Sequence, residues 1–187
     1  MSTEIKTALI RVLPFLVILI ILLIAFKNGK ISADDLGLHR PVSTRRFVYW
    51  IVGFFIFILL VESLLFITWL LDISPWRHPL IPSVIRIIGA VILAPVAEEF
   101  IFRGLLFNKL NNTKPGLHAA VFLQAFVFVM LHHFTYTYSL QSNLAMLQTL
   151  ADAVLYGYAR HYSRSIFTPI AMHMTGNAIA TLERFAF

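Results

Sequence analysis

The sequence predicts an all-α protein, a polytopic membrane helical bundle with about six transmembrane helices. Hydrophobic residues make up 59% of its 187 residues and charged residues only 13%. Soluble domains average roughly 45–50% hydrophobic residues and about 25% charged residues. The mean hydropathy is +0.81, and several apolar runs approach the roughly 20 residues that a helix needs to cross the hydrocarbon core. Neither the alternation typical of strands nor an internal repeat is visible.

Six segments are predicted to form the helices of this bundle. They are residues 8–26, 47–71, 84–107, 117–138, 144–158 and 166–182. The first two are almost purely apolar, the next two are interrupted by charged or histidine residues, and the last two are shorter and more polar. We expect one integral membrane domain over residues 1–187, with two N-terminal spans and their loops in residues 1–83.

The formal net charge of +6 does not indicate a nucleic-acid partner, because the basic residues lie mainly between apolar runs. Nine Lys and Arg residues fall in the first, third and fifth loops, against five on the opposite side. This bias predicts that both termini lie outside and that the odd loops are cytoplasmic, in the plasma (inner) membrane. The chain has no cysteine, which excludes thiol nucleophiles and thiolate metal sites.

Three charges stand within six residues of the third predicted span: Glu98, Glu99 and Arg103. Ionisable groups inside a membrane are costly and usually mark function. Glu99 and Arg103 are four residues apart, so they share a helix face and can pair. Glu98 is rotated by about 100° from Glu99, without a cation nearby in the sequence, and is therefore available as a general base or acid.

His132 is expected to lie level with Glu98. The midpoint between the two residues is Pro115, in the turn that joins the third and fourth spans, so two antiparallel helices would bring them to the same height. Phe128 precedes His132 by four residues and could wall the site against lipid. His133 follows directly, and the sequence leaves open which histidine of the pair is used.

His173 and Asn177 are also four residues apart and share one face of the last predicted helix. At ~1.5 Å per helical residue, His173 lies about 10 Å and Glu98 about 14 Å from the same, predicted cytoplasmic, side. The three polar groups are therefore expected to converge on one site that faces the cytoplasm.

These residues resemble the motifs of the CAAX protease and bacteriocin-processing (CPBP, or Abi) family. The matching stretches are EEFIFRGLLF, FVMLHH and YGYARHYSRSIFTPIAMHMTGN, in this order. The resemblance covers roughly residues 85–178 as a catalytic core. It implies an intramembrane endopeptidase that hydrolyses a peptide bond near the C-terminus of a membrane-associated peptide or lipidated protein, such as a prenylated CAAX protein, with membrane lipid as the other partner.

The resemblance also implies roles for single residues. Glu98 would activate the attacking water and His132 would help to orient it, whereas His173 and Asn177 would stabilise the oxyanion. Glu99 and Arg103 would support the helix.

A zinc ion is the alternative, because Glu98, His132 and His173 form a two-histidine, one-carboxylate set like those of many zinc hydrolases. Glu98 would then be a ligand, and a separate base would be needed. We favour chemistry without a metal or other cofactor.

Two other functions compete with the protease. Relatives of this family that give immunity to bacteriocins suggest a non-catalytic immunity protein. Such a protein would not need the full set of Glu98, His132, His173 and Asn177. A small transporter would also place polar residues near the membrane midplane, but should show paired halves with interrupted helices. All of these residues are present, and the sequence shows no internal repeat of the kind expected for a transporter. Both observations favour the enzyme.

Overall fold

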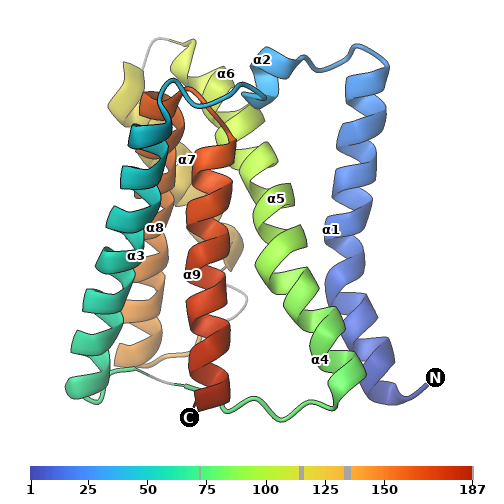
Figure 1. Ribbon diagram of the computed structural model, residues 1–187, viewed down its shortest axis with the longest axis vertical. Coiled ribbons are helices and arrows are strands. Elements are labelled where there is room, and N and C mark those ends of the chain that lie inside the picture. Colours follow the sequence, from blue (N-terminus) through green and yellow to red (C-terminus); the bar gives the residue numbers. More distant parts are fainter. Residues whose placement is uncertain (72, 114–115, 133–135, 187) are drawn as a thin grey trace.

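The computed structural model describes residues 1–71, 73–113, 116–132 and 136–186. Within these ranges all regular structure is helical, and the long helices run side by side in one bundle (Figure 1). The predicted all-α membrane bundle is confirmed, and the chain is an integral membrane protein.

The elements follow the predicted order, with one short helix added in the first loop. They are α1 (Thr3–Lys27), α2 (Ala33–Leu36), α3 (Thr44–Ile67), α4 (Leu80–Ile87), η1 (Ile88–Leu93), α5 (Ala94–Glu99), η2 (Phe100–Leu106), α6 (Phe107–Asn111), α7 (Gly116–His132), α8 (Leu140–Ser163) and α9 (Phe167–Ala186). The elements from α4 to α6 form one continuous helix, Leu80–Asn111, in which η1 and η2 are π-helical.

Three helices in the described part of the chain are long and apolar enough to cross a membrane: α1, α3 and Leu80–Asn111. Helix α7 is apolar but has only 17 residues. The outward faces of α1 and α3 are apolar, with Leu13 57% and Leu60 67% exposed. Contiguous apolar surface marks a contact with membrane or with another protein, and on helices of this length and hydropathy it indicates lipid.

Helix α8 is longer than predicted. It covers 24 residues, Leu140–Ser163, where the sequence pattern suggested only residues 144–158. The residues that the prediction left out, 140–143 and 159–163, are mostly polar. At the start the Ser139 side chain caps the helix by accepting from the Ser142 N–H, and at the end Arg160 and Ser163 are buried. These residues lower the hydropathy of the segment without shortening the helix.

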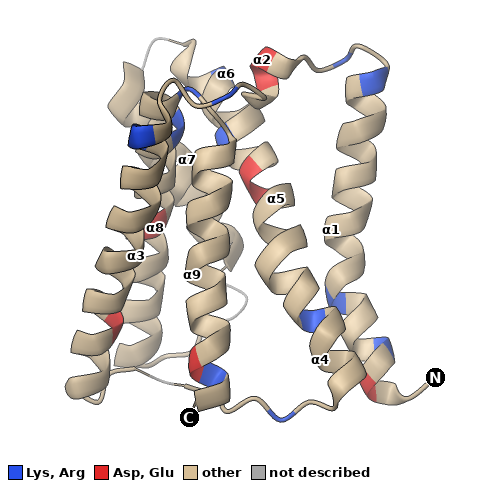
Figure 2. Ribbon diagram, viewed as in Figure 1, with Lys and Arg blue, Asp and Glu red and all other residues tan. Residues whose placement is uncertain are grey.

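Both termini lie at the same end of the bundle (Figure 1). Lys and Arg gather toward its two ends (Figure 2). The orientation in the membrane stays a prediction from the loop charges. The turn between α6 and α7 includes residues 114 and 115, which lie outside the described residues.

The first loop is fastened to the fifth loop at the end opposite the termini. The backbone N–H of Ile166 donates to Gly37 O at 2.9 Å, and that of Val42 donates to Ser163 O at 3.1 Å. Helix α2 begins with a capping box between Ser32 and Asp35. The Ser32 hydrogen bonds lower the pKa of the Asp35 carboxyl.

Leu36 of this loop packs directly on η2. A Cβ at Gly104 would lie 3.3 Å from the Leu36 backbone, which is tighter than usual packing. The glycine therefore lets the loop approach the helix that carries the candidate site.

Candidate active site

Glu98 and Glu99 lie in α5, a short α-helical stretch between two π-helical segments. Wide π-helical turns are rare and occur frequently at functional sites. The sequence gives no periodic signal for them, and the prediction had assumed a continuous α-helix.

Glu99 and Arg103 form a fully buried ion pair. Arg103 Nη1 lies 2.9 Å from Glu99 Oε1, and both side chains are 0% exposed. Arg103 Nη2 also donates to Ala153 O at 2.9 Å. The guanidinium lies over the rings of Phe128 at 4.7 Å and Tyr156 at 5.1 Å. The predicted pairing of Glu99 with Arg103 is confirmed, and this cation also joins η2 to α7 and α8.

Glu99 has a second partner that the sequence did not reveal. Its Oε1 lies 2.9 Å from His173 Nδ1, a contact between residues 74 positions apart. A buried carboxylate accepts, so Nδ1 donates and the Nε2 side of the ring turns elsewhere. Tyr156 stacks on the same imidazole at 5.1 Å between ring centroids. Glu99 therefore orients His173 in addition to neutralising Arg103.

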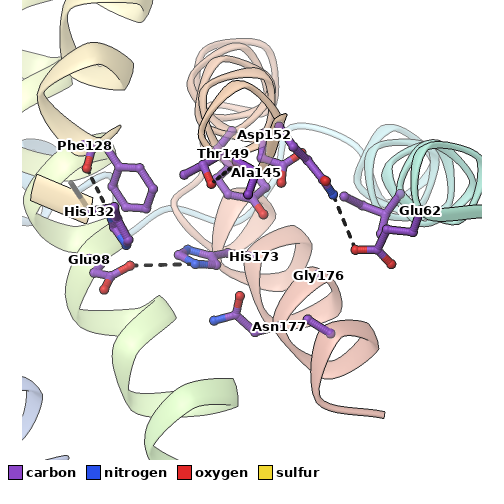
Figure 3. Close-up of a pocket in the computed structure, with 14 residues that line it drawn as sticks. Glu62, Glu98, Phe128, His132, Ala145, Thr149, Asp152, His173, Gly176 and Asn177 are labelled. Carbon is purple, nitrogen blue, oxygen red and sulfur yellow. Dashed lines mark hydrogen bonds and ion pairs between the residues drawn. The ribbon is translucent and has the colours of Figure 1, made fainter. Parts of the chain in front are cut away.

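Glu98 lies beside the other nitrogen of His173. Glu98 Oε2 is 3.7 Å from His173 Nε2 (Figure 3). The Glu98 side chain is 17% exposed, in contrast to the enclosed Glu99. The sequence had left Glu98 without a cation nearby, and the structure places an imidazole from α9 next to it.

His132 stands at the end of α7, next to Phe128. Its Nδ1 lies 2.8 Å from Phe128 O, and because a carbonyl only accepts, Nδ1 carries the proton and Nε2 the lone pair in the neutral ring. The Phe128 ring contacts the imidazoles of both His132, at 4.5 Å, and His173, at 6.0 Å between centroids. Phe128 is thus packed between the two histidines. His133 lies outside the described residues.

Asn177 binds the backbone of a π-helical segment. Its Nδ2 donates to Ala90 O, in η1, at 2.8 Å. The amide carries a second N–H, and the residue lines the same cavity as His173. The side chain is therefore held in place by one hydrogen and can offer the other to a ligand.

A cavity of about 300 Å³ joins these groups. Glu98, His132, His173 and Asn177 all line it, so the structure brings together the residues that the sequence singled out. Figure 3 shows Glu98 and His132 on one side, with His173 and Asn177 projecting from α9.

The opposite wall is polar as well, and the sequence reasoning missed it. Glu62 from α3 and Gln148 and Asp152 from α8 line the cavity, and Gln148 Nε2 donates to Glu62 Oε1 at 3.4 Å. Gln148, Asp152 and Tyr156 follow at intervals of four residues, which is the signal that would have found this face.

The zinc alternative requires Glu98, His132 and His173 to face one ion. Within the described residues, no group of three or more His, Asp or Glu side chains is placed to hold a metal ion. Both histidines have Nδ1 held by an acceptor, which orients Nε2 equally well for a ligand bond or for a hydrogen bond. The arrangement of Glu98, His132 and His173 does not form a ready ligand set, and we derive no step through a metal.

The fold and the site together define a polytopic helical membrane protein with a glutamate–histidine cluster buried in its bundle. A comparison with protein families matches residues 79–179 to the Type II CAAX prenyl endopeptidase Rce1-like family. The chain belongs to this family of protease-type hydrolases. Comparisons with curated proteins and with solved structures gave no match.

Proposed function

We propose that this protein is an intramembrane endopeptidase that cleaves a peptide bond near the C-terminus of a membrane-associated peptide or lipidated protein. The observation that carries the proposal is the placement of Glu98 Oε2 at 3.7 Å from His173 Nε2 on a cavity that His132 and Asn177 also line. Peptide hydrolysis needs a base, a positioned water and donors for the oxyanion in an enclosed site.

In this proposal water is the nucleophile. Glu98 takes a proton from the water while the Nε2 lone pair of His132 accepts the second O–H and fixes its direction. The water oxygen then bonds to the carbonyl carbon, and the carbonyl electrons move to oxygen. Glu98 returns its proton to the leaving nitrogen as the oxyanion re-forms the C=O bond and the C–N bond breaks, which yields a carboxylic acid and an amine. The remaining O–H proton of the acid then passes to the amine, so that the products are a carboxylate and an ammonium ion.

The developing oxyanion is held by donors from α9. The second N–H of Asn177 donates to it, since the first is used by Ala90 O. His173 can donate from Nε2 only as an imidazolium, because Glu99 engages Nδ1. Before the reaction the cationic ring stands between the carboxylates of Glu98 and Glu99. Once Glu98 has taken up the proton of the water, the oxyanion replaces it as the negative partner of the ring, so the cation stays compensated throughout.

The substrate class is supported by the family and by the setting of the cavity. The family description names CAAX prenyl endopeptidases, whose substrates end in a short peptide next to a lipid-modified cysteine. A cavity of about 300 Å³ is at the lower end of the range for ligand sites, which suits a short peptide segment. We place the site toward the cytoplasmic side of the plasma membrane, as the loop charges indicate.

The test is comparative peptidomics of membranes that contain the wild-type protein or Glu98→Gln. Peptides released by the wild type should be absent with Glu98→Gln, because the shape of the side chain stays and the base is lost. Glu62→Gln is the matched control, since it makes the same change in the opposite wall of the cavity (Figure 3).

Identical peptides from wild type and Glu98→Gln would refute the base assignment. Protection against a bacteriocin by both proteins, without cleavage by either, would support the immunity protein instead.

A further inference from the structure

A second and larger cavity of about 780 Å³ lies at the end of the bundle that carries both termini. Residues of α1, of the helix Leu80–Asn111 and of α9 line it. Three arginines, Arg11, Arg86 and Arg184, face this space together with His78, and no acidic residue is among its described lining residues. The proposed hydrolysis uses none of these cations.

The three guanidinium groups lack acidic partners in the cavity. Arg86 Nε is buried without a hydrogen-bond partner. Arg184 Nε donates to Ser74 O at 2.9 Å, and its guanidinium lies over the Trp76 ring at 5.0 Å. Glu4 is at this end of the chain: its carboxylate is 3.5 Å from His78 Nδ1 and its charge also acts on Arg86, but one carboxylate cannot compensate three guanidinium groups.

Arg11 and Arg86 stand about two turns inside helices that are apolar and long enough to cross a membrane. Arg11 is eight residues from the start of α1 and Arg86 six residues from the start of α4, which corresponds to about 12 Å and 9 Å along the helices. Burying cations at such depth is costly unless an anion compensates them.

Much of the remaining wall of the cavity is apolar, although Asn177 also lines it. Val12 and Phe15 from α1 and Ala94 from α5 line it. The neighbouring residues Leu13 and Leu16 on α1 are 57% and 40% exposed, so the cavity adjoins surface that faces lipid. An occupant therefore has an anionic end for the arginines and an apolar part for α1.

We propose that this cavity binds the phosphate of an anionic membrane phospholipid, whose acyl chains continue along α1. Arginine forks match phosphate geometry through paired N–H···O hydrogen bonds. Three guanidinium groups supply more N–H donors than a single carboxylate can accept, which favours a phosphate over the carboxylate of a peptide C-terminus. Basic pockets between transmembrane helices are suited to such headgroups.

The headgroup site borders the candidate active site. Asn177 lines both cavities, and its acceptor Ala90 lines the arginine cavity. The lipid proposal is nevertheless independent of the protease proposal, because its test measures binding alone.

Fluorescence of Trp76, which lines the cavity, provides the test. The full chain with Trp50→Phe and Trp69→Phe is placed in nanodiscs that contain brominated phosphatidylglycerol or brominated phosphatidylcholine at constant ionic strength. Half-maximal quenching should require at least about tenfold less phosphatidylglycerol. The added change Arg11→Gln/Arg86→Gln should abolish this preference, since each cation near an anionic lipid contributes roughly fivefold in affinity.

Lys27→Gln/Lys30→Gln is the matched control, because it removes two charges at the other end of α1 and should keep the preference. Arg86→Lys retains the charge and tests the site if the double arginine variant does not fold; it should weaken the preference without removing it. Equal quenching by the two lipids, or a full preference in the correctly folded arginine variant, would overturn the proposal. Loss of the preference on adding millimolar inorganic phosphate in place of chloride would show a site for free phosphate and would also overturn the lipid assignment.

Discussion

Replacing Glu99 by glutamine should destabilise the protein strongly while leaving the shape of the side chain unchanged. Glu99 and Arg103 are both 0% exposed, and glutamine removes the charge that compensates the guanidinium. Breaking one partner of a buried ion pair costs about 3–5 kcal/mol. For a chain of this size, 1 kcal/mol shifts Tm by roughly 2–4 °C, so Tm should fall by about 6–20 °C.

The assay is thermal unfolding of the purified protein in detergent micelles, followed by tryptophan fluorescence. Glu98→Gln is the control, because the Glu98 side chain is 17% exposed and lies beside His173, whereas Glu99 is the carboxylate paired with Arg103. Its Tm should stay within about 2 °C of the wild type.

A double variant separates charge burial from general damage. Glu99→Leu/Arg103→Met should recover much of the lost stability, since a buried ion pair can often be replaced by apolar residues at little cost. The carbonyl of Ala153 would keep a donor, because Gln124 Nε2 also reaches it at 3.1 Å. If Glu99→Gln melts within about 2 °C of the wild type, the Glu99–Arg103 ion pair does not stabilise the fold.

Three further outcomes are expected. Asn177→Ala should lower kcat by about 10²–10³, the usual cost of one oxyanion donor, and a loss below about fivefold in a cleavage assay would remove Asn177 from that role. Cysteines at the exposed positions 112 and 143 should react differently in intact cells, with only Asn143→Cys open to impermeant reagents; the reverse pattern would invert the topology. Activity should survive prolonged chelation, whereas one zinc per chain, lost in both His132→Ala and His173→Ala, would establish the metal mechanism.

The sequence predicted the helices well because hydropathy is a local property. Each of the six predicted segments corresponds to a helix of the structure. The site residues could be predicted for a related reason, because helix geometry relates spacing along the chain to position in space. Glu98 and His132 are equally far from one turn, which predicts that they lie at the same height. His173 and Asn177 are four residues apart, which predicts that they share one helix face. The structure places all four on one cavity.

Contacts between distant helices could not be predicted in this way. The hydrogen bond between Glu99 and His173 depends on how α9 is rotated against α5, and spacing within one helix does not contain that rotation. Ser163 shows the same limit: it falls in the predicted loop between the segments 144–158 and 166–182, but it is 0% exposed, because the first loop packs on it through Val42.

The π-helical segments make insertions and deletions more informative than substitutions in this chain. A single residue removed from Ile88–Leu93, which form η1, would convert the wide turn to ordinary α geometry, and the helix beyond it would keep its direction because a π-helical turn accommodates one extra residue. A single residue removed from the α-helical stretch Leu80–Ile87 would instead turn everything beyond it by about 100°. Glu98 would then leave the cavity although every candidate catalytic side chain was still present in the sequence. When two members of this family are aligned, the position of a one-residue gap in this helix therefore decides whether the directions of its side chains are kept or changed.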